Sequence, residues 1–580
     1  MIMLEIESRF AQSTQIMKRN LKYTLVMAAS GLLLTALALE QTTLAQAPAG
    51  PADPRLGSKV KFTSEQASVQ DIVQSLAEQV GLRYDRQKSF AQTDPLCRNW
   101  VRNVAIEGKT CNEALEQVLK PVGLRYQVEE GVLVLSRQGE GTQPPQIRAS
   151  SNSLPVGKGY VTNGSAPVGL TPARVLSAQE QRENFDFLCK AIDETYASFE
   201  LKAIDWQGVR RRYQERLDPA ASADQFYRLL FQLVNELKDT HSSLQNYRPA
   251  FPASGPGLTV ALFQSKPFIV AVDADSDAAG LGVKPGSEVL EVDGLPVEDE
   301  IERLRPRLRA CSSERAFRRE ACRYLLAGER DTKVNVKLRL PDGRAQTFRL
   351  RRTAGVSDPP RQPCSFDLKE QRFVQFGRHP SGLGYIRITS FDAHEEVAQE
   401  FDQALEALRT APGLILDIRD NPGGYNQERI VGRLLQRPTL GTISFIKNGP
   451  GHGALKRQDA ILEPTGPWQY SGPIALLVND LTGSAADLFA CHLRSAKRVV
   501  TVGSTTHGNL SGVAAYAVLP CGLVVRISNG YICDAGGKPI EGNGNEPDVI
   551  VAPTISDFLA GRDPVLEKAV ALVREKSQRN

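Results

Sequence analysis

The sequence lacks several patterns that mark common functional classes. It contains no Cys-x-x-Cys pair and no cysteine and histidine cluster with zinc-ligand spacing, so a structural metal site has no support. It has no long lysine or arginine run, and 70 basic residues nearly balance 66 acidic ones, so nothing indicates nucleic-acid binding. Beyond one segment near the N-terminus, no apolar run is long enough to cross a membrane. We therefore expect neither a metal ion nor a cofactor.

The composition is that of a multidomain globular protein. The chain has 580 residues, of which 41% are hydrophobic and 23% are charged, and this length suggests roughly three to five domains. Near the N-terminus, Lys18, Arg19 and Lys22 precede an apolar run over residues 25–39, and an Ala-Gln-Ala sequence ends at Ala47. This pattern predicts a signal peptide over residues 1–47 and export to the periplasm or cell envelope. The alternative is an uncleaved anchor, although the run is shorter than the roughly 20 residues of a span.

Export would permit disulfide bonds among the nine cysteines. Three pairs lie close together in the sequence and are plausible local bridges: Cys97 with Cys111, Cys311 with Cys322, and Cys521 with Cys533. Cys189, Cys364 and Cys491 are left over. We expect one or more of these three to be a buried free thiol.

Residues 58–138 predict a small α/β unit with two helices and several short strands. The phrase Val-Gly-Leu-Arg-Tyr occurs at residues 80–84 and again at 122–126, which marks two similar helix-to-strand corners. The unit resembles the short N-terminal domain of secretins and TonB-dependent receptors, and the resemblance implies docking to an envelope protein partner. The following residues 139–175 are rich in Gly, Pro, Ser, Gln and Asn, and predict a linker.

Residues 176–250 have helical periodicity and end near Asp239, Thr240 and His241. A histidine at that place has two interpretations. It can be a solvated residue at the C-terminus of a helix, where the helix dipole favours it, or it can be a positioned general base. The pattern alone leaves both open.

Residues 254–354 are β-rich and resemble a PDZ domain. The resemblance rests on a small-residue helix start at Ala278, a Pro-Gly turn at 285–286 and an Asp-Gly hairpin at 293–294. It implies capture of a peptide as an added strand, with its C-terminal carboxylate held by backbone N–H groups. The corresponding loop consists of Gly257, Leu258, Thr259 and Val260. An insert over residues 301–326 departs from a minimal PDZ domain.

Residues 366–556 alternate strand-like and helical patterns, as α/β folds do. An apolar run over residues 473–478 breaks at small polar residues around Ser484, after which a helical pattern begins. This places Ser484 at a strand-to-helix turn. Its hydroxyl can be exposed beside the first free N–H groups of the helix, or it can serve only as a helix N-cap.

Three motifs together resemble the carboxy-terminal-processing (tail-specific) protease family. They are Leu-Asp-Ile-Arg-Asp-Asn-Pro-Gly-Gly at 416–424, Thr-Gly-Ser-Ala-Ala-Asp at 482–487 and Glu-Gly-x-Gly-x-x-Pro-Asp at 541–548, and their order matches over residues 177–553. The resemblance implies that Ser484 is a nucleophile. It also implies a multidomain α/β and α+β protein with these parts: a ClpP/crotonase-like protease core over 366–556, an inserted PDZ domain, the helical region, the small docking domain, and a helical tail over 557–580.

The general base differs from that of the bacterial processing proteases. They use a lysine 25 residues after the nucleophile, where this chain has Asn509, and an asparagine side chain cannot accept the serine proton near neutral pH. The tricorn-like branch uses serine, histidine and glutamate instead. In that branch His241 corresponds to the base, Glu541 to the orienting acid and Thr240 to a relay between them. His507, near the lysine position, is a rival base without an assigned acid.

The resemblance also suggests an oxyanion hole formed by the N–H of Ala485 with that of Gly423 or Gly424. We therefore predict an exported serine endopeptidase that cleaves protein or peptide substrates through an acyl-enzyme. The alternative is an inactive protease-like scaffold that acts as a binding protein at the cell envelope. The absence of the lysine at position 509 is the reason to consider this alternative. A fluorophosphonate probe would separate these two hypotheses.

Overall fold

The computed structural model describes residues 55, 58–80, 82–84, 100–119, 124–129, 132–137, 160–163, 176–360, 365–512 and 514–579. The predicted signal peptide lies outside these residues. The chain divides into two compact units, Met1–Pro144 and Pro145–Asn580. Within the described residues, no helix is both long and apolar enough to cross a membrane.

The first unit contains two amphipathic helices and two small sheets. The helices α2 (Val69–Gln79) and α4 (Cys111–Leu119) bury apolar side chains such as Ile72, Leu76 and Leu115 against each other and the strands. The strands are β1 (Lys59–Ser68) antiparallel to β3 (Trp100–Thr110), and β5 (Val132–Arg137) between β2 (Arg83–Tyr84) and β4 (Leu124–Glu129). In the described part of this unit, the two helices agree with the number that the sequence pattern predicts.

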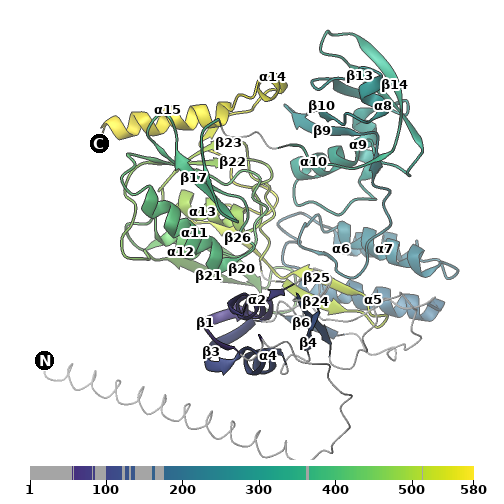
Figure 1. Cartoon of the computed structure of the whole chain (residues 1–580). Coiled ribbons are helices and arrows are strands. Elements are labelled where there is room, and N and C mark those ends of the chain that lie inside the picture. Colours follow the sequence, from purple (N-terminus) through teal and green to yellow (C-terminus); the bar gives the residue numbers. More distant parts are fainter. Residues whose placement is uncertain are drawn as a thin grey trace, which may run out of the picture. The chain divides into compact units, whose positions relative to one another are not determined.

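The second unit is built around a seven-stranded sheet (Figure 1). In spatial order its strands are β16 (Lys369–Glu370), β17 (Val374–Arg378), β18 (Gly384–Ile388), β19 (Leu414–Asp417), β22 (Ile474–Val478), β23 (Val500–Gly503) and β27 (Val549–Ile550). The strands from β18 to β27 are parallel. Such strands are buried on both faces, which explains why β22 has an unbroken apolar sequence.

Helices cover both faces of this sheet. Helices α11 (His394–Ala407), α12 (Glu428–Gly432) and α13 (Ala485–Ser495) share one core with Ile474, Leu476 and Val478 of β22. On the other face, α15 (Pro564–Arg579) packs against Ala475 and Leu477, and Figure 1 shows it in yellow. The segment over residues 557–580, predicted as a helical tail, contains α15, and the apolar side chains of α15 belong to the core of the sheet.

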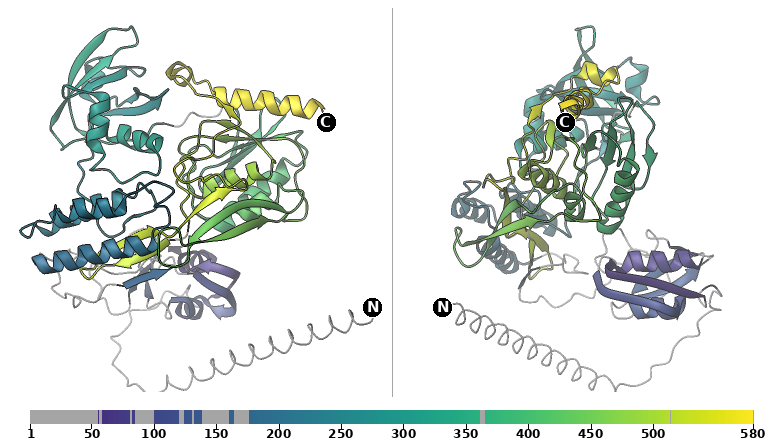
Figure 2. Two further views of the ribbon diagram at one scale, coloured as in Figure 1. Left: turned by 180° about the vertical axis from the view of Figure 1, so that it is seen from behind. Right: turned by 90° about the vertical axis from the view of Figure 1, so that its left-hand side faces the viewer.

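A four-stranded antiparallel sheet joins the helical region to the core. Its order is β6 (Tyr160–Asn163), β24 (Ala514–Val518), β25 (Val524–Ser528) and β7 (Ser243–Leu244). Helices α5 (Ala178–Thr195), α6 (Trp206–Gln214) and α7 (Ala223–Asn235) bury their apolar sides in one cluster with β25, and Figure 2 shows α5 to α7 in blue beside the yellow-green strands. The predicted linker over 139–175 thus contains a strand, because β6 pairs with the edge of β24.

Residues 254–354, called the β-rich domain here, form a sheet in the order β14 (Ala345–Arg351), β13 (Lys333–Arg339), β11 (Glu288–Val292), β10 (Lys266–Val272) and β9 (Leu258–Phe263), with β12 (Leu295–Pro296) paired to β11. The strands β8 (Ser254–Gly255) and β15 (Ala354–Gly355) pair where the chain enters and leaves it. The predicted insert forms the end of α9 (Val297–Leu304) and all of α10 (Glu314–Tyr324). Helix α10 lies against β9, the edge strand.

The predicted disulfide bonds are wrong wherever the structure describes both partners. Cys311 and Cys322 are both free, and so are Cys521 and Cys533. Cys322 faces the core of the β-rich domain, and Cys521 lies in the core of the helical region whereas Cys533 belongs to β26 (Gly530–Asp534) in another sheet. Closeness in sequence therefore does not bring these thiols together. Cys111, Cys189 and Cys491 are buried free thiols, while Cys97 and Cys364 lie outside the described residues.

Candidate active site

Ser484 lies at the carboxyl edge of the parallel sheet, where α/β folds place their ligand sites. Strand β22 ends at Val478, next to β19, whose own end leads into the glycine turn. Ser484 has φ 53° and ψ −120°, a conformation that costs a residue with a side chain of order 1–3 kcal/mol. It is the N-cap of α13, yet its side chain makes no capping hydrogen bond. The interpretation of Ser484 as a capping side chain is therefore wrong.

Two contacts hold this strained turn. The Ser484 N–H donates to Asn509 Oδ1 at 2.6 Å, and the Ala486 N–H donates to the Gly483 carbonyl at 2.9 Å. The buried carboxylate of Asp487 in turn accepts the N–H groups of Gly508 and Asn509 at 3.0 and 3.2 Å. Asn509, which stands at the lysine position of the processing proteases, therefore holds the backbone of Ser484.

His241 faces the Ser484 hydroxyl. Its Nε2 lies 3.2 Å from Ser484 Oγ, across 243 residues of sequence. Helix α7 ends at Asn235 with Glu236 as its C-cap, so the interpretation of His241 as a helix C-terminal residue is wrong. The short pairing of β7 with β25 immediately follows His241 and fixes where the loop enters the core.

The electrostatics of His241 keep its ring neutral near pH 7. Burial lowers the pKa of His241 to about 4, and the positive charges of Arg526 and Arg309 act in the same direction, whereas Asp239 opposes them. A neutral imidazole with a free Nε2 lone pair can accept the proton of a serine hydroxyl.

The structure does not contain the predicted hydrogen-bonded connection from Glu541 through Thr240 to His241. His241 Nδ1 lies 3.2 Å from Ser511 Oγ, and Ser511 Oγ donates to Asp239 Oδ1 at 3.1 Å. The Thr240 hydroxyl instead accepts hydrogen bonds from the backbone and the hydroxyl of Ser312, at 2.9 and 3.2 Å. The relay role of Thr240 is therefore corrected, because its hydroxyl faces the β-rich domain.

Glu541 is close to the site but has another partner. Its Oε1 accepts a hydrogen bond from Lys202 Nζ at 2.6 Å, and the glutamate is 1% exposed. Burial raises the pKa of Glu541 to about 7, with a further contribution from the negative charge of Asp239. Glu541 thus forms a buried ion pair with Lys202.

His507, the rival base, is held through its backbone. Its N–H donates to the Thr482 carbonyl at 2.8 Å, and its carbonyl accepts the Ser313 hydroxyl at 2.8 Å. Burial lowers the pKa of His507 to about 4. Within the described part of the chain, the ring Nε2 of His507 is buried without a hydrogen-bond partner, so the contact of Ser484 with His241 favours His241 as the base.

The glycine turn after β19 approaches the predicted nucleophile closely. Gly423 and Gly424 have φ of 102° and 133°, which favours glycine. The Gly423 N–H already donates to Asn421 Oδ1 at 2.9 Å. Of the two glycines expected to join Ala485 in an oxyanion hole, Gly424 is therefore the better candidate, and Gly423 supplies the space beside Ser484.

Replacing Gly423 by alanine should disrupt this approach. A Cβ there would lie 2.7 Å from Ser484 Cβ and 2.8 Å from Ala485 N, closer than packed atoms allow. We expect kcat/KM for peptide hydrolysis to fall at least a hundred-fold, the order of losing one oxyanion donor. Gly382→Ala is the matched control, because its φ is 87° and a Cβ there meets nothing within 4 Å. A nearly unchanged kcat in Gly423→Ala would contradict the close approach of Gly423 to Ser484 and Ala485.

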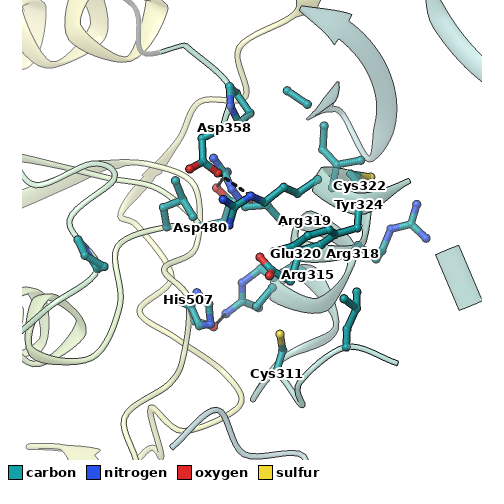
Figure 3. A pocket seen from close by; sticks show the side chains of 18 of the residues that line it. Cys311, Arg315, Arg318, Arg319, Glu320, Cys322, Tyr324, Asp358, Asp480 and His507 are labelled. Atoms are coloured by element: carbon teal, nitrogen blue, oxygen red, sulfur yellow. Dashed lines mark hydrogen bonds and ion pairs between the residues drawn. The ribbon is translucent and has the colours of Figure 1, made fainter. Parts of the chain in front are cut away.

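A cavity of about 1090 Å³ lies beside these loops. One side is formed by the β-rich domain and includes residues of β9 and α10; the other includes Pro422, Asp480 and His507. Figure 3 shows Arg315 and Arg319 extending from α10 toward His507 and Asp480. Nine arginines line the cavity against five carboxylates, which gives it a net positive charge: Arg248, Arg307, Arg309, Arg315, Arg318, Arg319, Arg323, Arg387 and Arg419.

Two protein family models match parts of this chain near the site. Residues 382–551 match the model of peptidase family S41, and residues 177–235 match the tricorn protease C1 domain. The segment over residues 382–551, called the S41 domain here, is thus similar to the peptidases of family S41. Ser484, Asn509 and Glu541 fall within the S41 domain, whereas His241 follows the segment that matches the tricorn C1 domain. The carboxy-terminal processing proteases similar to the S41 domain are serine-type peptidases.

Individual relatives agree with this assignment. Tricorn protease homolog 1 of Streptomyces coelicolor is 23% identical over 428 residues, which is 71% of this chain and 37% of that protein. Carboxy-terminal processing protease CtpA of Bacillus subtilis is 23% identical over 400 residues, 67% of this chain and 72% of that protein. The chain thus spans between 33% and 37% of the length of two tricorn homologues it matches.

Among solved structures, mature CPAF has a similar fold. The TM-score is 0.58 at 18% sequence identity, and the match covers 70% of this chain and 98% of that one. This likeness supports the mixed α/β fold around the S41 domain. Among the described residues, no group of three or more histidine, cysteine, aspartate and glutamate side chains could hold a metal ion.

Proposed function

We propose that this protein is an exported serine endopeptidase that cleaves peptide bonds of protein or peptide substrates through an acyl-enzyme. The observation that carries the proposal is the 3.2 Å contact of His241 Nε2 with Ser484 Oγ, at the strand end of a domain that matches peptidase family S41. A nucleophile within hydrogen-bond reach of a base, which is itself oriented by a third group, is the arrangement that acyl transfer requires.

In the proposed reaction, Ser484 Oγ attacks the carbonyl carbon of the scissile peptide bond while its proton passes to His241 Nε2. The N–H groups of Ala485 and Gly424 receive the negative charge that develops on the carbonyl oxygen. The C–N bond then breaks, and His241 returns the proton to the leaving amine. A water molecule, deprotonated by His241, hydrolyses the resulting ester and restores Ser484.

The experiment that tests this proposal is labelling with a fluorophosphonate probe, followed by identification of the modified residue. Covalent modification of Ser484 and hydrolysis of a peptide library that is lost in Ser484→Ala are the expected results. Absence of both would favour an inactive scaffold that binds partners at the cell envelope. The N-terminal unit is proposed to dock such a partner, and export is proposed on the basis of the segment over 1–47.

The β-rich domain is proposed to capture the substrate as an added strand, in the manner of PDZ domains. Strand β9 is an edge strand, and it includes Leu258, Thr259 and Val260 of the expected peptide-binding loop. Gly257, the first residue of that loop, has φ 72°, and its carbonyl accepts the Asp273 N–H at 2.8 Å. Residues 260–265 line the large cavity, so a strand added there would lead toward the site.

The positive charge of the cavity supports a preference for acidic substrate segments. Within the described residues, no carboxylate lies at ion-pair distance from Arg248, Arg307 or Arg309. The ion pairs of the cavity are made by five other arginines: Arg318, Arg319, Arg323, Arg387 and Arg419. Arg309 donates to the Thr240 carbonyl at 2.6 Å, next to His241. Unpaired cations in a cleft attract segments of opposite charge.

Peptides that carry glutamate or aspartate in the part bound by the cavity should therefore be cleaved with about tenfold higher kcat/KM than matched peptides with lysine there. Most of the difference should come from a lower KM. The preference should weaken as salt increases from about 0.05 to 0.5 M. The double variant Arg248→Gln, Arg307→Gln should reduce it. Arg349→Gln is the control, because Arg349 is exposed on β14 and does not line the cavity. Equal kcat/KM for both peptide sets would contradict the preference.

A further inference from the structure

We propose that Asp239, acting through the hydroxyl of Ser511, is the acid that orients His241, and that Glu541 serves as the partner of Lys202. Both Asp239 and Ser511 are positioning residues in this proposal. Its kinetic part rests on the proposed peptidase function, whereas the hydrogen-bond arrangement can be tested without any turnover.

The hydrogen bonds of Ser511 have a consistent direction. Ser528 Oγ donates to Ser511 Oγ at 2.9 Å, and Ser511 Oγ donates to Asp239 Oδ1 at 3.1 Å. A serine hydroxyl has one proton and two acceptor lone pairs. Since its proton points to Asp239, Ser511 can only accept from His241 Nδ1, which lies 3.2 Å away. The proton of the neutral imidazole is thereby held on Nδ1, and Nε2 is left free toward Ser484.

Asp239 is fixed on both of its oxygens. Oδ1 also accepts the His241 backbone N–H at 2.8 Å, and Oδ2 accepts the Ser242 hydroxyl at 3.2 Å. The residue has no exposed surface. Burial alone would raise the pKa of Asp239. The charge of Lys202, the interaction with the His241 ring when it is protonated, and the hydrogen bond from the His241 backbone N–H together outweigh burial, so the pKa lies below its ordinary value. An ionised carboxylate at this place stabilises the imidazolium that forms during proton transfer.

Glu541 interacts with Lys202 and makes no hydrogen bond to His241 among the described residues. Lys202 Nζ donates to Glu541 Oε1 at 2.6 Å and to the Lys238 carbonyl at 2.6 Å, and the lysine side chain is only 9% exposed. The pair is buried between the helical region and the segment after β26. Breaking such a pair leaves an uncompensated buried charge, which is costly. We therefore infer that Glu541 contributes to stability, whereas Asp239 contacts the imidazole of His241 through the Ser511 hydroxyl.

Four variants separate these roles. Asp239→Asn should lower kcat by about a thousand- to ten-thousand-fold, because an amide can donate to Ser511 and favour the opposite tautomer of His241. Ser511→Ala should lower kcat roughly a hundred-fold with little change in KM, and Ser511→Thr, which keeps the hydroxyl, should recover much of the loss. Glu541→Gln should lower kcat less than tenfold but reduce thermal stability. A larger loss in Glu541→Gln than in Asp239→Asn, or a wild-type kcat in Ser511→Ala, would overturn the proposal.

The tautomer of His241 provides an independent measurement. The chain has six histidines, so ¹⁵N labelling of histidine gives few signals. At pH 7 we expect Nδ1 of His241 to be protonated in the wild type and the signal to shift toward the Nε2-protonated form in Ser511→Ala. Ser381→Ala is the matched control: Ser381 Oγ lies 2.8 Å from His379 Nδ1, so only the His379 signal should change. A His241 tautomer that is the same in wild type and Ser511→Ala would overturn the proposal even if the protein proved to have no peptidase activity.

Discussion

Replacing Ser484 by alanine should lower kcat for peptide hydrolysis by about a million-fold, because the nucleophile of a serine peptidase and its base act as one unit. Any residual rate would come from the oxyanion donors and from substrate binding. Ser484 Oγ has His241 Nε2 as its neighbour and makes no capping bond, so the variant should keep the fold. The measurement is steady-state hydrolysis with the same peptides, together with thermal unfolding of both proteins.

A second substitution at the same position separates catalysis from backbone strain. Ser484→Gly should be as inactive as Ser484→Ala but more stable than it, by about 1 kcal/mol, because glycine adopts φ 53° without the steric cost. This difference would be visible in denaturant unfolding. Substantial activity in Ser484→Ala, with the peptide hydrolysis still inhibited by a fluorophosphonate, would place the nucleophile at another serine.

The strand-turn-helix around Ser484 could be predicted from the sequence because local signals agree there. An apolar run that ends at small polar residues predicts a buried parallel strand, and the structure has β22 at Ile474–Val478 followed by α13 from Ala485. Helix α4 was predictable for the same reason, since its pattern of buried Ala114, Leu115 and Val118 is local. Periodicity of this kind depends only on neighbouring residues.

The partners of His241 could not be predicted because they depend on long-range packing. Ser511 lies 270 residues from His241 and 272 from Asp239, and nothing in its local sequence distinguishes it from other serines. The family resemblance named Glu541 as the acid, yet Lys202, which comes from the helical region, pairs with it. The only local signal was the Asp-Thr-His sequence, in which Asp239 stands two residues before His241.

The disulfide prediction failed for a related reason. Closeness in sequence brings two cysteines together only if the chain between them turns back. Cys521 is buried in the cluster of the helical region, whereas Cys533 lies on β26, which pairs with β20 (Thr439–Lys447). Burial raises the pKa of the Cys521 and Cys533 thiols to about 11 in both cases. Such thiols are inert neutral side chains that fill space.

Replacing His241 by alanine should also lower kcat by about a million-fold, since Ser484 then has no acceptor for its proton. His507→Ala is the informative comparison, because His507 is the rival base. If His241 is the base, His507→Ala should lose far less activity, and the reverse order would assign the base to His507. The variant His394→Ala is the control and should keep wild-type activity, because the side chain of His394 lies on the surface and is 40% exposed.

The pH dependence of the wild type should show how burial tunes this histidine. Burial lowers the pKa of His241 to about 4, with Arg526 contributing next. Above that pH the imidazole is neutral and accepts the proton of Ser484, and below it the ring is protonated and cannot. The acid limb of kcat/KM should therefore lie near pH 4, where a histidine at its ordinary pKa of about 6.5 would already be inactive. Arg526→Gln removes a cation and should move the limb to higher pH. A limb near pH 6.5 that is insensitive to Arg526→Gln would mean that His241 is solvated and does not occupy the buried position beside Ser484 in the working enzyme.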